Sequence, residues 1–291
     1  MNFKKLILLL LLSSVTAAFV LYNIQKRLIF SDNKKDILFS FKIVNDKYLL
    51  SCSDNKVYVY SENGELFCQY ELRNEIILSS SISDLDKDNK DEIILLTSTE
   101  ISQYGDDLVV LSFDHYEENN ATKSAIVFKE IYRNHCKDLN PWKVQTSDVD
   151  GDKKSEISLG VYKTSPLHPI MAKRPFIYDW VNGGIFPKWR GSRLSRPFDD
   201  YVFLDLDSDG RDEIVSIEYT PNGSKVLASY SWKGFGFEKT GESKNFKDIS
   251  SLQVELIKGQ KTNVISAEVK ENTVSMKKTF YYLEGKILIK E

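Results

Sequence analysis

The sequence is poor in the residue types that build thiolate, disulfide or histidine sites. It has 3 cysteines and 3 histidines among 291 residues. The cysteines Cys52, Cys68 and Cys136 permit at most one intrachain disulfide. Cys52 and Cys68 lie within one predicted repeat and form the candidate pair, but we expect free buried thiols. Disulfides are therefore not what stabilises this fold.

Motifs of the common enzyme classes are also missing. The chain contains no H-E-x-x-H, G-x-S-x-G or phosphate-loop pattern. The histidines His115, His135 and His168 fall in polar or proline-flanked segments typical of turns. A net charge of −3 argues against nucleic-acid binding. The absence of these motifs favours a protein that is not an enzyme.

Long apolar runs are absent except near the N-terminus, where residues 6–24 lie between Lys4-Lys5 and Lys26-Arg27. As a helix this run would span about 28 Å, close to the thickness of a bilayer core. We therefore expect a single-pass cell-membrane anchor (1–27), a linker (28–37) and an extracytoplasmic domain (38–291). The alternative is a secreted protein cleaved near Thr16-Ala17-Ala18.

What the sequence does contain is a nine-residue acidic pattern that occurs three times. Asp stands at positions 1, 3 and 5, Glu at position 9, and Ile follows each copy. The copies begin at residues 84, 148 and 205, so their spacings are 64 and 57 residues. The acids are Asp84, Asp86, Asp88 and Glu92 in the first acidic loop; Asp148, Asp150, Asp152 and Glu156 in the second; and Asp205, Asp207, Asp209 and Glu213 in the third.

Carboxylates at this spacing repel one another unless the loop is open and solvated or holds a hard cation. Ca²⁺ suits such an oxygen-rich set, whereas Zn²⁺ would require His or Cys, and Mg²⁺ prefers fewer protein oxygens. An EF-hand is excluded because position 12 is Leu95, Leu159 or Ser216, none of which can act as its bidentate acid. The flanks also alternate as strands do. The alternative is a set of acidic surface turns without an ion.

This strand-flanked pattern resembles the FG-GAP or VCBS repeat of integrin α-subunits and bacterial surface proteins. The resemblance implies up to three structural Ca²⁺ ions, held by the acids above and by the position-7 carbonyls of Lys90, Lys154 and Arg211. Position 6 is usually Gly in that family, but it is Asn89 and Lys153 in two copies. We expect weaker ion binding in those two.

A second series consists of an aromatic residue followed by a tight turn, which is typical of β-hairpins. Its members are Tyr60, Phe113, Trp180, Trp232 and Tyr282. The two series interlock at a period near 50 residues, and 15 Tyr and 16 Phe with only 7 Pro favour strands. Together they predict an all-β fold: a β-propeller of about five four-stranded blades with calcium-binding loops, preceded by one N-terminal hydrophobic helix. A sandwich with a smaller β domain is the alternative.

Residues 163–200 combine basic and aromatic side chains with five of the seven prolines. Arg can pair with carboxylate or phosphate and stack on aromatic rings. This segment predicts an anion-binding site formed by Lys173, Arg174, Lys188, Trp189, Arg190, Arg193 and Arg196. Alternatively, these charges balance nearby acids such as Asp179, Asp199 and Asp200.

We therefore expect an extracytoplasmic, calcium-stabilised β-propeller that binds a cell-surface or cell-envelope ligand or a protein partner. Two other functions stay open. One is a cell-envelope hydrolase that uses acids in the propeller channel, and the other is a structural scaffold for a membrane protein. An acid pair outside the three loops, facing a pocket, would favour the hydrolase.

Overall fold

The computed structural model describes residues 37–43, 46–61, 63–117, 124–191, 193–255, 264–271 and 274–290. Within these ranges the chain folds into strands and one short 3₁₀ helix, η1 (Lys137–Leu139). The expectations for residues 1–27 and for most of the linker fall outside the described residues. The predicted N-terminal hydrophobic helix (within residues 1–27) falls in that part of the chain.

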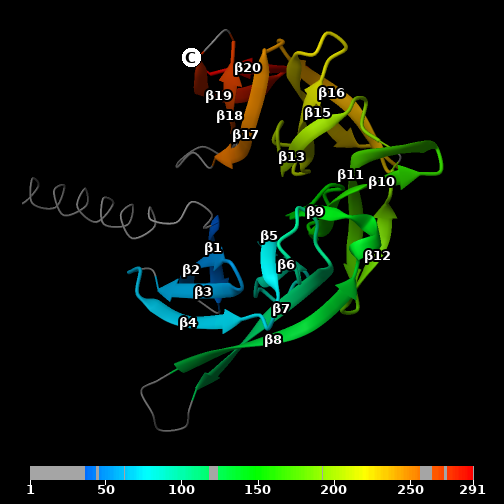
Figure 1. Ribbon diagram of the computed structural model, residues 1–291. Helices are drawn as coiled ribbons and strands as arrows, with labels where there is room; N and C mark the ends of the chain where they lie inside the picture. Colours follow the sequence, from blue (N-terminus) through cyan, green and yellow to red (C-terminus); the bar gives the residue numbers. More distant parts are fainter. Residues whose placement is uncertain are drawn as a thin grey trace, which may run out of the picture.

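Successive groups of four antiparallel strands make up the structure (Figure 1). Unit 1 contains β1 (Ile37–Ile43), β2 (Asp46–Ser53), β3 (Lys56–Ser61) and β4 (Leu66–Glu71). Unit 2 contains β5 (Ile76–Ser83), β6 (Glu92–Ser98), β7 (Asp107–Glu117) and β8 (Ser124–His135). Unit 3 contains β9 (Pro141–Ser147), β10 (Glu156–Ser165), β11 (His168–Val181) and β12 (Gly184–Trp189). Unit 4 contains β13 (Phe198–Leu204), β14 (Glu213–Tyr219), β15 (Lys225–Trp232) and β16 (Phe237–Ser243), and unit 5 contains β17 (Asp248–Glu255), β18 (Val264–Lys270), β19 (Ser275–Leu283) and β20 (Lys286–Ile289).

Tight turns occur at two of the positions where the aromatic series predicted hairpins. Asn182-Gly183 connects β11 to β12, and Glu284-Gly285 connects β19 to β20. All four of these turn residues have positive φ, between 47° and 79°, as a type I′ hairpin turn requires. The hairpin predictions at these two positions are confirmed.

Neighbouring units pack face to face, so the core consists of four apolar layers between them. Strand β6 shows how the period of two produces this arrangement. Ile93 and Leu95 contact the layer shared with unit 1, whereas Ile94 and Leu96 contact the layer shared with unit 3. Every residue of β6 is consequently buried, as expected of a strand covered on both faces.

The prediction of a five-bladed propeller is wrong, although the chain is all-β. Units 4 and 5 share one eight-stranded sheet, because β16 pairs in parallel with β20 through Glu242 with Lys286 and Ser243 with Ile287. The end strands β13 and β17 also contact each other, so this sheet is a nearly closed barrel. Units 1 to 5 follow an arc in Figure 1, and among the described residues no comparable contact joins unit 5 back to unit 1. The repeat period correctly predicted units of four strands, but it did not predict that two of these units would share one sheet.

The expectation of a membrane anchor must also be corrected. None of the described residues belongs to a helix long and apolar enough to cross a membrane. The apolar run 6–24 that suggested a single-pass cell-membrane protein lies outside those residues. The thiols of Cys52 and Cys136 are buried as expected, whereas that of Cys68 is half-buried.

Candidate metal centres in the acidic loops

The three acidic loops connect the first strand of a unit to its second strand, from β5 to β6, β9 to β10 and β13 to β14. Their backbones share one conformation, in which positions 4 and 6 have positive φ. The values are 67° and 67° for Lys87 and Asn89, 78° and 67° for Gly151 and Lys153, and 66° and 87° for Ser208 and Gly210. The buried position-2 residues Leu85, Val149 and Leu206 attach each loop to the core.

Hydrogen bonds to backbone amides fix the acids in the same way in all three loops. The position-1 carboxylate accepts the N–H of position 6, over 3.0, 2.8 and 3.1 Å in chain order. The position-9 carboxylate accepts the N–H of position 2, over 2.9 Å each time. The position-5 carboxylate accepts the N–H of position 7, over 2.8, 2.8 and 2.9 Å. The acids therefore stabilise the conformation of their own loops by accepting backbone hydrogen bonds, as Asp side chains commonly do in turns.

Three of the four acids converge in each loop. The carboxylate oxygens of positions 1, 3 and 9 lie within 4.8 Å of one another in the sets Asp84, Asp86, Glu92; Asp148, Asp150, Glu156; and Asp205, Asp207, Glu213. The position-5 acids Asp88, Asp152 and Asp209 are exposed and lie outside these sets. The predicted clusters that can hold a metal ion are confirmed, with three converging acids in each.

Burial destabilises the charged form of the acids in these clusters. The three closing glutamates are 2–3% exposed, and burial raises the pKa of Glu92, Glu156 and Glu213 to about 7 in each case. Oδ1 of Asp84 and Oδ1 of Asp205 are buried without a hydrogen-bond partner among the described residues. A buried carboxylate oxygen without a donor is costly. An oxygen-ligated cation such as Ca²⁺ fits this donor set in the first and third loops.

The second loop differs because an ammonium group reaches it. Nζ of Lys188, on β12, lies 2.6 Å from Oδ2 of Asp150, 2.6 Å from Oε1 of Glu156 and 3.0 Å from Oδ1 of Asp179. The Lys188 side chain is only 14% exposed. Burial acts to lower the pKa of Lys188, but its hydrogen bonds to the three carboxylates raise it above the ordinary value, so the group is protonated.

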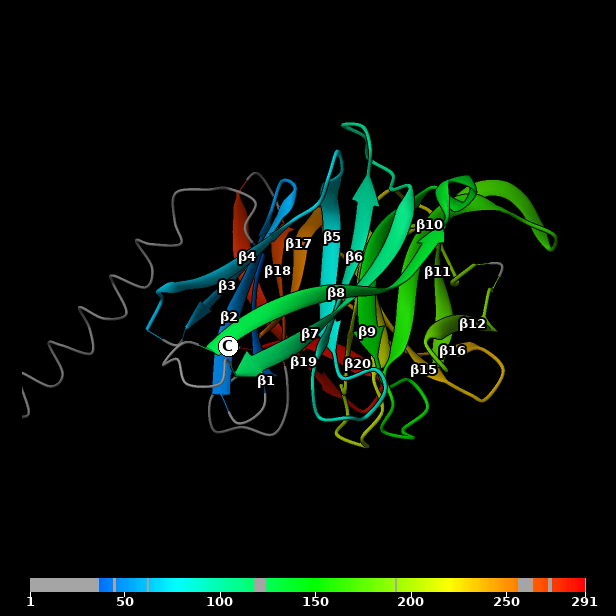
Figure 2. The ribbon, with the colours of Figure 1, turned by 90° about the horizontal axis from the view of Figure 1, so that it is seen from below.

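Contacts between the loops place them along one edge of the molecule, the lower edge in Figure 2. Ser83, just before the first loop, donates to the Ser155 hydroxyl of the second loop over 2.6 Å. Asp148 donates its N–H to Asp212 over 2.9 Å, and the N–H of Asp212 donates to the Asp148 carbonyl over 2.7 Å. The second and third loops are thus hydrogen-bonded to each other.

The structure does not gather the predicted anion-binding residues into one patch. On β11, Lys173 donates to the Asp199 carbonyl and lies 4.3 Å from the Trp142 ring centroid. Arg174 is fully buried and donates to the carbonyls of Lys163, His168 and Ile170, so it closes the end of the β10–β11 hairpin.

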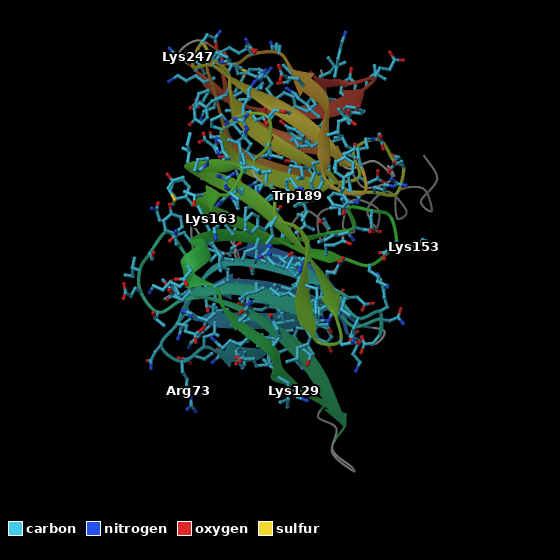
Figure 3. The ribbon with its side chains drawn as sticks, turned by 90° about the vertical axis from the view of Figure 1, so that its right-hand side faces the viewer. Arg73, Lys129, Lys153, Lys163, Trp189 and Lys247 are labelled. Carbon is cyan, nitrogen blue, oxygen red and sulfur yellow. The ribbon has the colours of Figure 1, made fainter. Side chains whose placement is uncertain are left out.

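The other predicted anion-binding residues are also dispersed. The Trp189 ring contacts Phe237 with the centroids 5.0 Å apart, and Arg196 pairs with Glu242 over 2.8 Å. Arg190 and Arg193 are exposed, and no other described residue forms an ion pair with either. Figure 3 shows Trp189 near the middle of its view, whereas Lys153 of the second loop lies at the right edge.

Sequence reasoning missed two residues of the second loop's surroundings. Lys188 was assigned to an external anion site, and Asp179 was assigned only to charge balance. The Ile177–Trp189 and Tyr178–Pro187 pairs leave Lys188 as the extra residue of a β-bulge, and a bulge redirects a side chain. No pattern in the sequence marks a bulge, although Pro187 is consistent with an irregular edge strand.

Comparisons with known proteins define no family for this chain. No family model matches the sequence, and no curated protein matches it. Among solved structures, the chain is similar to the crystal structure of BBS1N in complex with ARL6DN, soaked with mercury, with 13% identity and a TM-score of 0.44. The similarity covers 82% of this chain and 64% of that one. This similarity establishes neither a family nor a function for the chain, and the resemblance to FG-GAP and VCBS repeats stays a prediction.

Proposed function

We propose that this protein is a calcium-stabilised β-sheet module, in which Ca²⁺ bound to acidic loops holds the first and second strands of a unit together. The observation that carries this proposal is the pair of buried, unpartnered oxygens of Asp84 and Asp205 in clusters of three acids. A dication would offset the repulsion among the acids, which otherwise opposes folding. Asp84, Asp86 and Glu92, and the corresponding Asp205, Asp207 and Glu213, would be its ligands.

Thermal unfolding of the full chain tests this proposal. Millimolar Ca²⁺ should raise the melting temperature by about 5 °C or more relative to chelator, because a ligand that binds only the folded state stabilises it. Mg²⁺ should have a smaller effect, because it resists losing its water ligands. Asp205→Asn should reduce the calcium response, and Asp138→Asn, at an exposed acid in η1 outside the loops, should leave it unchanged. Equal melting temperatures with calcium and chelator would reject the proposal.

The biological role that we propose for this module is binding of an envelope ligand or a protein partner. Ca²⁺ at about millimolar concentration outside the cytoplasm would keep even weak sites filled, which suits the secreted alternative. Exposed Arg190 and Arg193 support an anionic ligand. Retention of the protein on dextran sulfate but not on neutral dextran, lost in the Arg190→Ala/Arg193→Ala variant, would support this role. Equal retention on both matrices would count against it.

The hydrolase alternative has less support. It requires an acid pair outside the loops that faces a pocket. The pocket between units 1 and 2 is lined by a single carboxylate residue, Asp54, among apolar and hydroxyl side chains such as Ile76 and Ser80. No acid pair of the kind that hydrolysis needs lines this pocket.

A further inference from the structure

Lys188 lies where a cation of the second acidic loop would be expected. Its Nζ is 2.6 Å from both Asp150 and Glu156, which are two of the three acids that converge in this loop. These are charge-assisted hydrogen bonds between an ammonium and two carboxylates, and they are short and largely shielded from solvent. The ammonium therefore bridges two of the three converging carboxylates, those of Asp150 and Glu156.

The first and third loops have no equivalent group among the described residues. In the first loop, the ion pair that forms joins Lys90 to exposed Asp88 over 3.9 Å, away from the three converging acids. In the third loop, the second oxygen of Glu213 accepts only the Ser231 hydroxyl, over 3.2 Å. Both loops retain a buried position-1 oxygen without a partner, whereas Oδ1 of Asp148 in the second loop accepts the N–H of Gly151 over 2.8 Å.

The fold explains how a residue of the outer strand reaches this loop. Strand order in unit 3 is β12-β11-β10-β9, and pairing of Ile157 with Tyr178 brings Asp179 of β11 beside Glu156 of β10. Two carboxylates side by side on adjacent strands repel each other. The bulge in β12 turns Lys188 toward these two carboxylates. Its ammonium donates to both of them and also to Asp150.

We propose that Lys188 is a built-in cation of the second acidic loop, and that the protein consequently binds Ca²⁺ in the first and third loops but not in the second. This inference rests on the proposed function, because it assigns which of the three loops take up the ion. For Ca²⁺ to enter the second loop, the Lys188 ammonium would have to leave three carboxylates and stay close to a dication. Charge repulsion opposes that arrangement.

Calcium stoichiometry of the full chain, measured by isothermal titration calorimetry and by native mass spectrometry, tests the inference. We expect two Ca²⁺ per chain for the unsubstituted protein and three for Lys188→Met, since removal of the ammonium leaves the second loop with the same three acids as the others. Lys143→Met is the matched control. Lys143 also lies in unit 3 in a short ion pair, 2.6 Å from Asp200, and is 20% exposed, so its substitution should leave two.

The possible outcomes distinguish the role of Lys188 from calcium binding by the protein as such. Three ions on the unsubstituted protein, or two on both that protein and Lys188→Met, would overturn the role of Lys188 and leave calcium binding intact. No ion on any variant would reject the proposed function and the inference with it. Lys188→Gln, which removes the charge but retains a polar group, gives the same comparison if the Met variant does not fold.

Discussion

The second and third acidic loops have nearly the same backbone and the same three converging acids, yet the closing Glu of each loop meets a different partner. Both close with a Glu that accepts the position-2 N–H over 2.9 Å. Beyond that bond, Glu156 meets the Lys188 ammonium and Glu213 meets a serine hydroxyl. Position 6 is Lys153 in the second loop and Gly210 in the third. An acidic turn pattern therefore specifies a loop conformation, while the neighbouring strands decide whether the protein itself places a cationic side chain against the acids.

The difference also explains why the second loop tolerates a departure from the expected pattern. Lys153 holds a φ of 67°, where an L-residue costs about 1–2 kcal/mol relative to the right-handed region. The loop retains its shape because its charges are neutralised within the protein and its backbone bonds to Asp212 of the third loop. We therefore expect its geometry not to depend on an added ion.

The largest effect should follow from removing the charge of the closing glutamate in the second loop. Glu156→Gln should lower the free energy of unfolding by about 2–3 kcal/mol, because it takes one buried carboxylate away from the Lys188 ammonium. The loss should be the same in calcium and in chelator, measured by urea unfolding at pH 7. A loss confined to calcium-containing buffer would mean that the second loop binds the ion after all.

The same substitution in the third loop should behave differently. Glu213→Gln should weaken calcium binding at that site at least tenfold, or about 1.4 kcal/mol, since it removes a charged ligand. In chelator its free energy of unfolding should equal or exceed that of the unsubstituted protein, because the substitution removes one of three mutually repelling charges and an amide oxygen can still accept the Leu206 N–H. Calorimetric titration and urea unfolding measure the two quantities. Strong destabilisation in chelator would indicate a missing internal partner for Glu213.

Substitutions at position 6 test how much the left-handed backbone conformation costs in each loop. Gly210→Ala should destabilise the protein by about 1 kcal/mol, because φ at this position is 87°. A Cβ there would meet nothing within 4 Å, so strain rather than a clash is responsible. Lys153→Gly should be neutral or stabilising by up to about 1 kcal/mol. Urea unfolding in chelator measures both, and destabilisation by Lys153→Gly would show that the lysine side chain contributes contacts that outweigh its strain.

Much of this local architecture follows from the sequence. The acid spacing defined three loops, and the alternation around them placed strands on both sides, because these features depend on residues close together in the chain. The turns at Asn182-Gly183 and Glu284-Gly285 were equally local. The sequence predicted four acidic ligands in each loop, but only those at positions 1, 3 and 9 converge. The position-5 acids are exposed, and each accepts a backbone N–H in the loop.

The predictions that were wrong concern contacts between residues far apart in the chain. The parallel pairing of β16 with β20 joins units 4 and 5 into one sheet, and no repeat period reveals such a pairing. A propeller requires each sheet to pack on the next around a closed ring, whereas here the last two sheets merge. Lys188 was assigned to external binding for a similar reason. Its partners are 9, 32 and 38 residues away in the sequence, and the bulge that directs it is set by strand register.

Asp106 provides the comparison for a buried acid that needs no ion. Its Oδ2 accepts the Thr99 N–H and hydroxyl over 2.9 and 2.8 Å, and its Oδ1 lies 3.0 Å from Nζ of Lys137. The Thr99 N–H bond is the main reason that the pKa of Asp106 falls from 3.8 to about 2. The stabilisation that this carboxylate contributes is therefore complete above about pH 4 and is lost as the pH falls through about 2.

Asp106→Asn should consequently lower the free energy of unfolding by about 0.5–1 kcal/mol near pH 7, a figure reduced for solvent screening of the Lys137 pair. The difference from the unsubstituted protein should shrink between pH 4 and pH 2, and calcium should not change it. Urea unfolding across this pH range, with and without chelator, measures the effect. A calcium-dependent difference would imply that Asp106 senses the loops, and the contrast between acids satisfied by the protein and acids that require a cation would then fail.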